Sequence, residues 1–187
     1  MGATIFPDLD TPQLIEMIKT GAVGVIRTDT LYGVVTSATN KESVERVYQV
    51  KNRSADKPVL VLIADQSQLF DPIPDELTDA LADLWPGPNS VAIPSPSAPD
   101  WLRHSDLTVA YRIPDDARLQ RFLAATGPLI APSANPEGLT PAKSIGEAQG
   151  YFGDTVDFYV DGGIVMNETP SHIYSFVSET GDLEQVR

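Results

Sequence analysis

The stretch PVLVLIA, residues 58–64, is an apolar run of strand length. An apolar run without polar alternation is typical of a strand in a sheet that is covered on both faces. Segments with helical and strand patterns alternate on both sides of this run, and no long polar linker separates them. The sequence therefore predicts a single α/β domain over residues 1–187.

Apolar spacing and helix-capping residues predict the elements around this run. Asp10-Thr11-Pro12 begins a helix that ends at Gly21, and Asn40 caps a second helix that ends near Lys51. Further helices are expected near 76–84, 116–126 and 143–152, and strands near 22–26, 90–94, 108–113, 128–131, 156–160, 172–176 and 184–186.

The composition excludes several kinds of site. The chain has 26 acidic and 13 basic residues, a formal net charge of -13 and no cysteine. Disulfides, thiolate metal sites and a cysteine nucleophile are therefore excluded. No segment has the length and apolarity of a membrane span, and the N-terminus lacks the pattern of a signal peptide. A cytoplasmic protein that binds nucleic acid weakly or not at all is expected.

Five of the thirteen cations lie within residues 41–57: Lys41, Arg46, Lys51, Arg53 and Lys57. Because the rest of the chain is acidic, this concentration favours a small phosphate-bearing ligand over a polyanion. An Arg fork and a Lys point charge are both suited to phosphate oxygens. The alternative is that these cations complement a helix C-terminus, which is worth about 0.3–1 kcal/mol.

Four polar clusters follow apolar or helical segments: Thr28–Gly33, Lys51–Lys57, Ala131–Asn135 and Pro170–Ile173. Ligands of α/β sheets gather at the carboxyl ends of strands, which makes the first placement suggestive. Ordinary turns and loops remain the alternatives for the first and third clusters, and His172 is either a surface residue or a titrating or metal-binding group. Walker-type, dinucleotide-binding and nucleophile-elbow motifs are missing.

Taken together, these clusters resemble the YrdC/Sua5 family, the threonylcarbamoyl-AMP synthases. The resemblance runs from about residue 10 to the end of the chain. It rests on T-D-T-x-Y-G (Thr28–Gly33), K-x-R (Lys51, Arg53), K-P-V (Lys57–Val59), W-P-G-P (Trp85–Pro88), V-x-R-x-P (Val109, Arg112, Pro114), S-A-N (Ser133–Asn135), S-x-I (Ser171, Ile173) and a closing Arg187.

The resemblance implies a single-domain twisted mixed sheet, flanked by helices, with a large concave cavity. It also implies an enzyme, a nucleotidyltransferase that makes threonylcarbamoyl-AMP and pyrophosphate from L-threonine, bicarbonate or CO2, and ATP. Mg²⁺ is expected on the ATP, and no metal-binding side chain of the protein is implied. The product would pass to a transferase that modifies tRNA to threonylcarbamoyladenosine.

Carried over by position, the resemblance implies two groups of binding residues, with Lys51 and Arg53 also as the catalytic cations. L-Threonine would contact Thr30, Tyr32, Arg112, Ala131 and Ser171. The nucleotide would contact Lys51, Arg53, Lys57, Thr108, Ser133, Asn135, Pro141 and Arg187.

Four positions depart from the family pattern. Leu62 stands where many members have a histidine, Glu137 replaces a serine, His172 replaces a threonine, and Asn89-Ser90 follows W-P-G-P. These departures leave a second interpretation open, a paralogue of the same fold that binds nucleotide or RNA without synthase activity.

Overall fold

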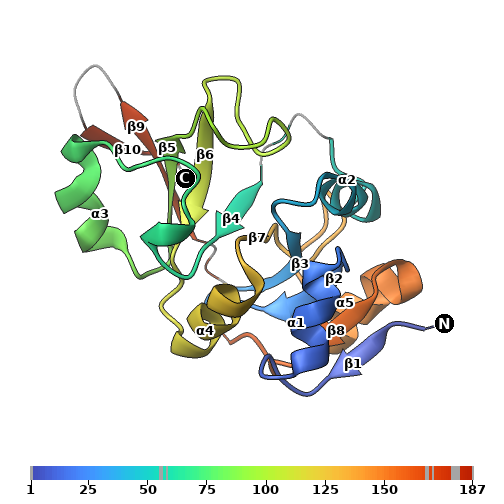
Figure 1. Cartoon of the computed structure of the whole chain (residues 1–187). Coiled ribbons are helices and arrows are strands. Elements are labelled where there is room, and N and C mark those ends of the chain that lie inside the picture. Colours follow the sequence, from blue (N-terminus) through green and yellow to red (C-terminus); the bar gives the residue numbers. More distant parts are fainter. Residues whose placement is uncertain are drawn as a thin grey trace.

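The computed structural model describes residues 2–54, 57, 59–166, 169, 171–177 and 182–186, which form one ten-stranded sheet with helices on both faces (Figure 1). In sheet order the strands are β1 (Thr4–Phe6), β8 (Phe158–Val160), β2 (Gly24–Arg27), β3 (Tyr32–Ser37), β7 (Leu129–Ile130), β4 (Leu60–Leu62), β6 (Thr108–Arg112), β5 (Asn89–Pro94), β9 (His172–Val177) and β10 (Asp182–Gln185).

The sheet is mixed. β8 runs parallel to β1 and β2, β4 is parallel to β6, and β5 is parallel to β9, while the remaining neighbours are antiparallel. The prediction of a mixed α/β sheet flanked by helices is confirmed. The apolar run that contains β4 lies in the interior of the sheet, between β7 and β6, as its lack of polar alternation predicted.

Each face of the sheet carries its own helices. Side chains of α2 (Lys41–Val50), α3 (Thr78–Leu84) and α5 (Ile145–Phe152) pack with Val61 and Tyr111 on one face. Side chains of α1 (Pro12–Lys19) and α4 (Ala117–Thr126) pack with Leu62 and Leu129 on the other, which we call the α4 face. Three short 3-10 helices, η1 (Gln66–Gln68), η2 (Asp75–Leu77) and η3 (Gly153–Thr155), complete the described elements.

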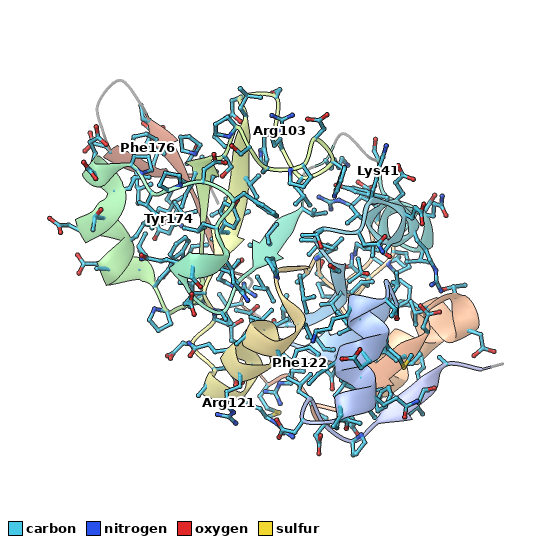
Figure 2. The ribbon with its side chains drawn as sticks, in the orientation of Figure 1. Lys41, Arg103, Arg121, Phe122, Tyr174 and Phe176 are labelled. Atoms are coloured by element: carbon cyan, nitrogen blue, oxygen red, sulfur yellow. The ribbon has the colours of Figure 1, made fainter. Side chains whose placement is uncertain are left out.

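Local signals explain where the helices begin. Pro12 occupies the first turn of α1, and the side chain of Asn40 caps α2 by accepting a 3.1 Å hydrogen bond from the Ser43 amide. Asp116 caps α4 in the same way. On α4, Phe122 is buried while its neighbour Arg121 is exposed and points outward (Figure 2).

Side-chain alternation along β6 sets up the functional site. Leu60 pairs with Ala110, and Leu62 pairs with Arg112. Because paired residues share a face, Arg112 lies on the α4 face while Tyr111 beside it enters the opposite core. A buried arginine therefore lies on the α4 face of the sheet.

Two strands were not expected from the sequence. β1 is a three-residue strand at the edge of the sheet, too short for a periodic signal. β3 is buried along its whole length, yet its sequence, YGVVTS, carries polar residues. The hydroxyl of Thr36 donates a hydrogen bond to the carbonyl of Ala22 at 2.9 Å. Because this polar group has a partner, a threonine is tolerated in the buried strand.

Candidate functional site

A cavity of about 260 Å³ is lined by side chains from segments that are far apart in the sequence. The hairpin between β2 and β3 forms one wall, and the segment after β7 forms another. Its lining residues are Thr28, Thr30, Leu31, Tyr32, Gly33, Arg53, Val59, Leu60, Arg112, Ala131, Pro132, Ser133, Pro141, Ser171 and Ile173.

The cavity brings together eight of the residues expected from the sequence: Thr30, Tyr32, Arg53, Arg112, Ala131, Ser133, Pro141 and Ser171. Residues from both expected groups, amino-acid and nucleotide, therefore share one cavity. The sequence assigns no binding role to the apolar part of the wall, which includes Leu31, Val59, Leu60 and Ile173. Val59 and Leu60 belong to the apolar run 58–64, while Leu31 and Ile173 lie within two of the polar clusters.

Arg112 is held by a buried carboxylate. Its Nη2 atom lies 3.1 Å from Oδ1 of Asp29, and the two side chains are 3% and 7% exposed. Burial raises the pKa of the Asp29 carboxyl, although the Arg112 guanidinium acts in the opposite direction. Asp29 belongs to the T-D-T motif, but its role could not be predicted from the sequence, because nothing there shows that it contacts Arg112.

Arg53 reaches the cavity from the loop after α2. Its amide donates to the carbonyl of Tyr48 at 2.9 Å, which turns the chain at the end of the helix. Its Nε donates to the carbonyl of Lys57 at 3.4 Å. Of the described residues, two arginines thus line the cavity, one with a buried carboxylate beside it and one on a loop at the helix end.

Lys51 differs from its expected placement. It is 2% exposed and is not among the described residues that line the cavity. Its ammonium donates to the carbonyl of Ser133 and, at 2.5 Å, to that of Asn135. Burial, with a smaller contribution from Arg53, lowers the pKa of Lys51 to about 8. In this structure Lys51 supports the Ser133–Asn135 segment rather than facing the cavity.

The Ser133–Asn135 segment is a closely bonded loop. The Ser133 hydroxyl donates to Oδ1 of Asn135 at 2.6 Å. The Asn135 amide group donates to the carbonyls of Pro136 and Leu139 at 2.9 and 2.8 Å. Asn135 therefore shapes the loop from within, while Ser133 and Pro141 reach the cavity itself.

Glu137 connects this loop to the cation-rich loop. Its carboxylate is ion-paired with the Lys57 ammonium and accepts from the Ser54 amide at 3.3 Å. Its own amide donates to the carbonyl of Lys51 at 2.8 Å. The hydrogen bond from Lys57 lowers the pKa of Glu137. Lys57 thus meets a carboxylate of the chain itself, at a position where the family pattern has serine.

Thr108 and His172 are not among the described residues that line the cavity. Thr108 is at the start of β6, about 13 Å along the strand from Arg112, and its hydroxyl donates to Asp106 at 2.7 Å. His172 is exposed at the start of β9, with Nδ1 3.4 Å from Oδ1 of Asn89. Arg187 lies outside the described residues.

Tyr32 contributes to the wall as a buried anchor. Its hydroxyl donates to the carbonyl of Gly163 at 2.7 Å and accepts from the amide of Gly162 at 3.0 Å. Burial raises its pKa, so the phenol stays protonated near neutral pH. Tyr32 therefore ties the start of β3 to residues 162–163.

Within the part of the chain that the structure describes, His, Cys, Asp and Glu side chains form no group of three that could hold a metal ion. Among the same residues, no helix combines the length and the apolarity required to cross a membrane.

Residues 16–185 match the sequence profile of the family Sua5_yciO_yrdC, described as Telomere recombination. The chain belongs to this Sua5/YciO/YrdC family. A curated member from Marinobacter nauticus, "Threonylcarbamoyl-AMP synthase", is 31% identical over 183 residues, which cover 91% of this chain and 96% of that protein.

Solved structures of the family share the fold. E. coli YciO superimposes with a TM-score of 0.85 at 20% identity, covering 99% of this chain and 95% of that one, and this likeness concerns the fold alone. P. abyssi Sua5 complexed with L-threonine gives a TM-score of 0.80 at 27% identity and covers 87% of this chain. This chain spans about half, 49%, of that Sua5 chain.

Proposed function

We propose that this protein is a threonylcarbamoyl-AMP synthase. The observation that carries the proposal is a single cavity lined both by Arg112, Thr30 and Ser171 and by Arg53, Ser133 and Pro141. The first three are the residues expected at an amino acid, and the others those expected at a nucleotide. The names of the curated relatives and of the threonine-bound Sua5 support this function over an RNA-binding paralogue.

The reaction requires no nucleophile from the protein. The neutral amine of threonine attacks CO2, which gives a carbamate and releases a proton; when bicarbonate is the source, one water is released instead of the proton. A carbamate oxygen then attacks the α-phosphorus of ATP, and the bond to pyrophosphate breaks. This is a nucleotidyl transfer, in which the protein positions the reactants and stabilises phosphate charge.

The threonine end of the cavity lies at Arg112. The fork of an arginine suits the two oxygens of a carboxylate, and the buried setting strengthens that interaction. Thr30 and Ser171 supply hydroxyl groups nearby, and Ala131 and Tyr32 complete the wall. Arg112, Thr30 and Ser171 would bind the carboxylate, the amine and the side-chain hydroxyl of the amino acid.

The nucleotide end lies at Arg53, Ser133 and Pro141, with Lys57 at its margin. Arg53 would stabilise the charge that develops on the transferring phosphate. Lys51 acts here by holding the Ser133–Asn135 loop through its two carbonyls. Mg²⁺ would be carried mainly by the triphosphate and water, as is usual for this ion at nucleotide sites.

The product is a reactive mixed anhydride, so a second enzyme must consume it soon after release. A cytoplasmic transferase that acts on tRNA fits that requirement. With a net charge of -13, the protein itself would bind tRNA weakly or not at all.

Pyrophosphate release tests this function. The purified protein with ATP and Mg²⁺ is expected to release pyrophosphate only when both L-threonine and bicarbonate are present. Release that is independent of both would contradict the synthase and favour a paralogue that handles nucleotide alone.

Glu137→Gln is expected to lower KM for ATP by about two- to fivefold and to leave KM for threonine unchanged. The triphosphate and the Glu137 carboxylate compete for Lys57, and glutamine removes the competing charge while it can still accept from the Ser54 amide. Steady-state kinetics at low and high salt would measure the change, which should shrink as salt screens the charges.

Glu147→Gln is the matched control for this variant. Glu147 is an exposed carboxylate that accepts from the Lys143 amide at 2.9 Å and does not line the cavity among the described residues. Its replacement should leave both KM values as they are. An unchanged or higher KM for ATP in Glu137→Gln would show that Glu137 does not compete with the nucleotide.

A further inference from the structure

Asp29 meets Arg112 from outside the cavity. It lies in the hairpin between β2 and β3, and it is not among the described residues that line the cavity. Instead it borders a neighbouring hollow of about 370 Å³, together with Asp115 and Asp116 of the segment between β6 and α4. The guanidinium of Arg112 thus has the substrate cavity on one side and a carboxylate on another.

The carboxylate of Asp29 lies where two segments that are distant in the sequence come together, the β2–β3 hairpin and the loop after β6. Burial raises the pKa of this carboxyl overall, while the Arg112 guanidinium and the backbone N–H groups of Asp29 and Asp115 favour its charged form.

A buried arginine requires such a partner. An unpaired buried charge costs several kcal/mol, and Asp29 supplies an opposite charge beside the Arg112 side chain, which is 3% exposed. The ion pair also limits the rotation of the guanidinium plane, and a planar fork binds a carboxylate well only in the right plane. The same contact thus stabilises the cation and sets its orientation.

We propose that Asp29 is a positioning residue that orients the Arg112 guanidinium toward the carboxylate of an α-amino acid in the cavity. This inference rests on the proposed function, in which Arg112 binds the substrate carboxylate. Asp29 acts only through Arg112 and does not touch the substrate. Its effect should therefore appear in amino-acid binding and not in ATP binding.

Calorimetric titration of L-threonine into the full-length protein, without ATP, tests this role. Asp29→Ala is expected to raise Kd for threonine by about tenfold or more, because the fork loses its orienting partner. Asp29→Asn keeps a hydrogen-bond acceptor at the same place and should stay within about threefold of the wild type. L-Threonine amide, which lacks the carboxylate charge, should respond little to either change.

A double-mutant cycle separates positioning from general damage. If Asp29 acts through Arg112, adding Asp29→Ala to Arg112→Ala should change Kd for threonine by less than about twofold. Asp115→Ala is the matched control, because it removes a carboxylate that borders the same hollow and leaves its backbone N–H in place. That variant should bind threonine like the wild type.

Normal threonine binding in Asp29→Ala, or additive losses in the double variant, would overturn the positioning role. KM for ATP, measured in parallel, should not change in Asp29→Ala. An equal rise in Kd for threonine and in KM for ATP would indicate a structural defect, and it would also overturn the positioning role. If the wild type releases pyrophosphate with threonine while Asp29→Ala behaves normally, only this inference fails. If the wild type binds no threonine at all, the proposed function fails with it.

Discussion

Arg112→Ala is expected to lower kcat/KM for L-threonine by about two orders of magnitude or more and to leave KM for ATP nearly unchanged. The variant removes the cation proposed to bind the substrate carboxylate. It also leaves Asp29 buried without its partner, and the pKa of that carboxyl, already raised by burial, should rise further. Initial rates with varied threonine at saturating ATP and bicarbonate would measure the effect.

Two further variants serve as controls for that result. Arg112→Lys keeps the charge but loses the fork, so it should recover only part of the activity. Arg118→Ala removes an arginine that pairs with Asp8 and Asp10 near the surface, and it should leave the kinetics intact. Normal threonine kinetics in a folded Arg112→Ala protein would remove Arg112 from the amino-acid site.

Arg53→Ala is expected to lower kcat/KM for ATP by about two orders of magnitude, with KM for threonine close to the wild-type value. Arg53 is the arginine that reaches the cavity from the loop after α2, beside the Ser133 segment expected at the nucleotide. Its loss would weaken both phosphate binding and stabilisation of the transferring phosphate. Kinetics with varied ATP would show the change.

Arg121→Ala provides the control for Arg53, because Arg121 is exposed on α4 and points away from the molecule (Figure 2). It should have no effect on either substrate. If Arg53→Ala instead weakened threonine and spared ATP, the two ends of the cavity would have to be exchanged.

The helices and strands that the sequence predicts are all present, because their signals are local. A cap such as Asn40 and an apolar run such as residues 58–64 act within a few residues. β3 could not be expected from its own residues because its burial depends on its neighbours, β2 on one side and β7, about ninety residues later in the chain, on the other. A polar residue such as Thr36 is tolerated there only because the carbonyl of Ala22 accepts its hydroxyl.

The candidate site could be predicted only as a set of residue types. The motifs indicated Arg112, Thr30 and Ser133, which the structure brings into one cavity. They could not indicate which polar groups satisfy one another, because such pairs are set by the packing of distant segments. The pairing of Asp29 with Arg112, of Glu137 with Lys57, and of Lys51 with the Ser133 loop became visible only in the fold.

The most direct measurement is the identity of the product formed with ¹³C-labelled bicarbonate. Mass spectrometry of a reaction with L-threonine, ATP and Mg²⁺ should detect threonylcarbamoyl-AMP with the label in its carbamoyl group, together with pyrophosphate. Release of pyrophosphate without a labelled threonine adduct of AMP, or no nucleotide turnover at all, would contradict the synthase function.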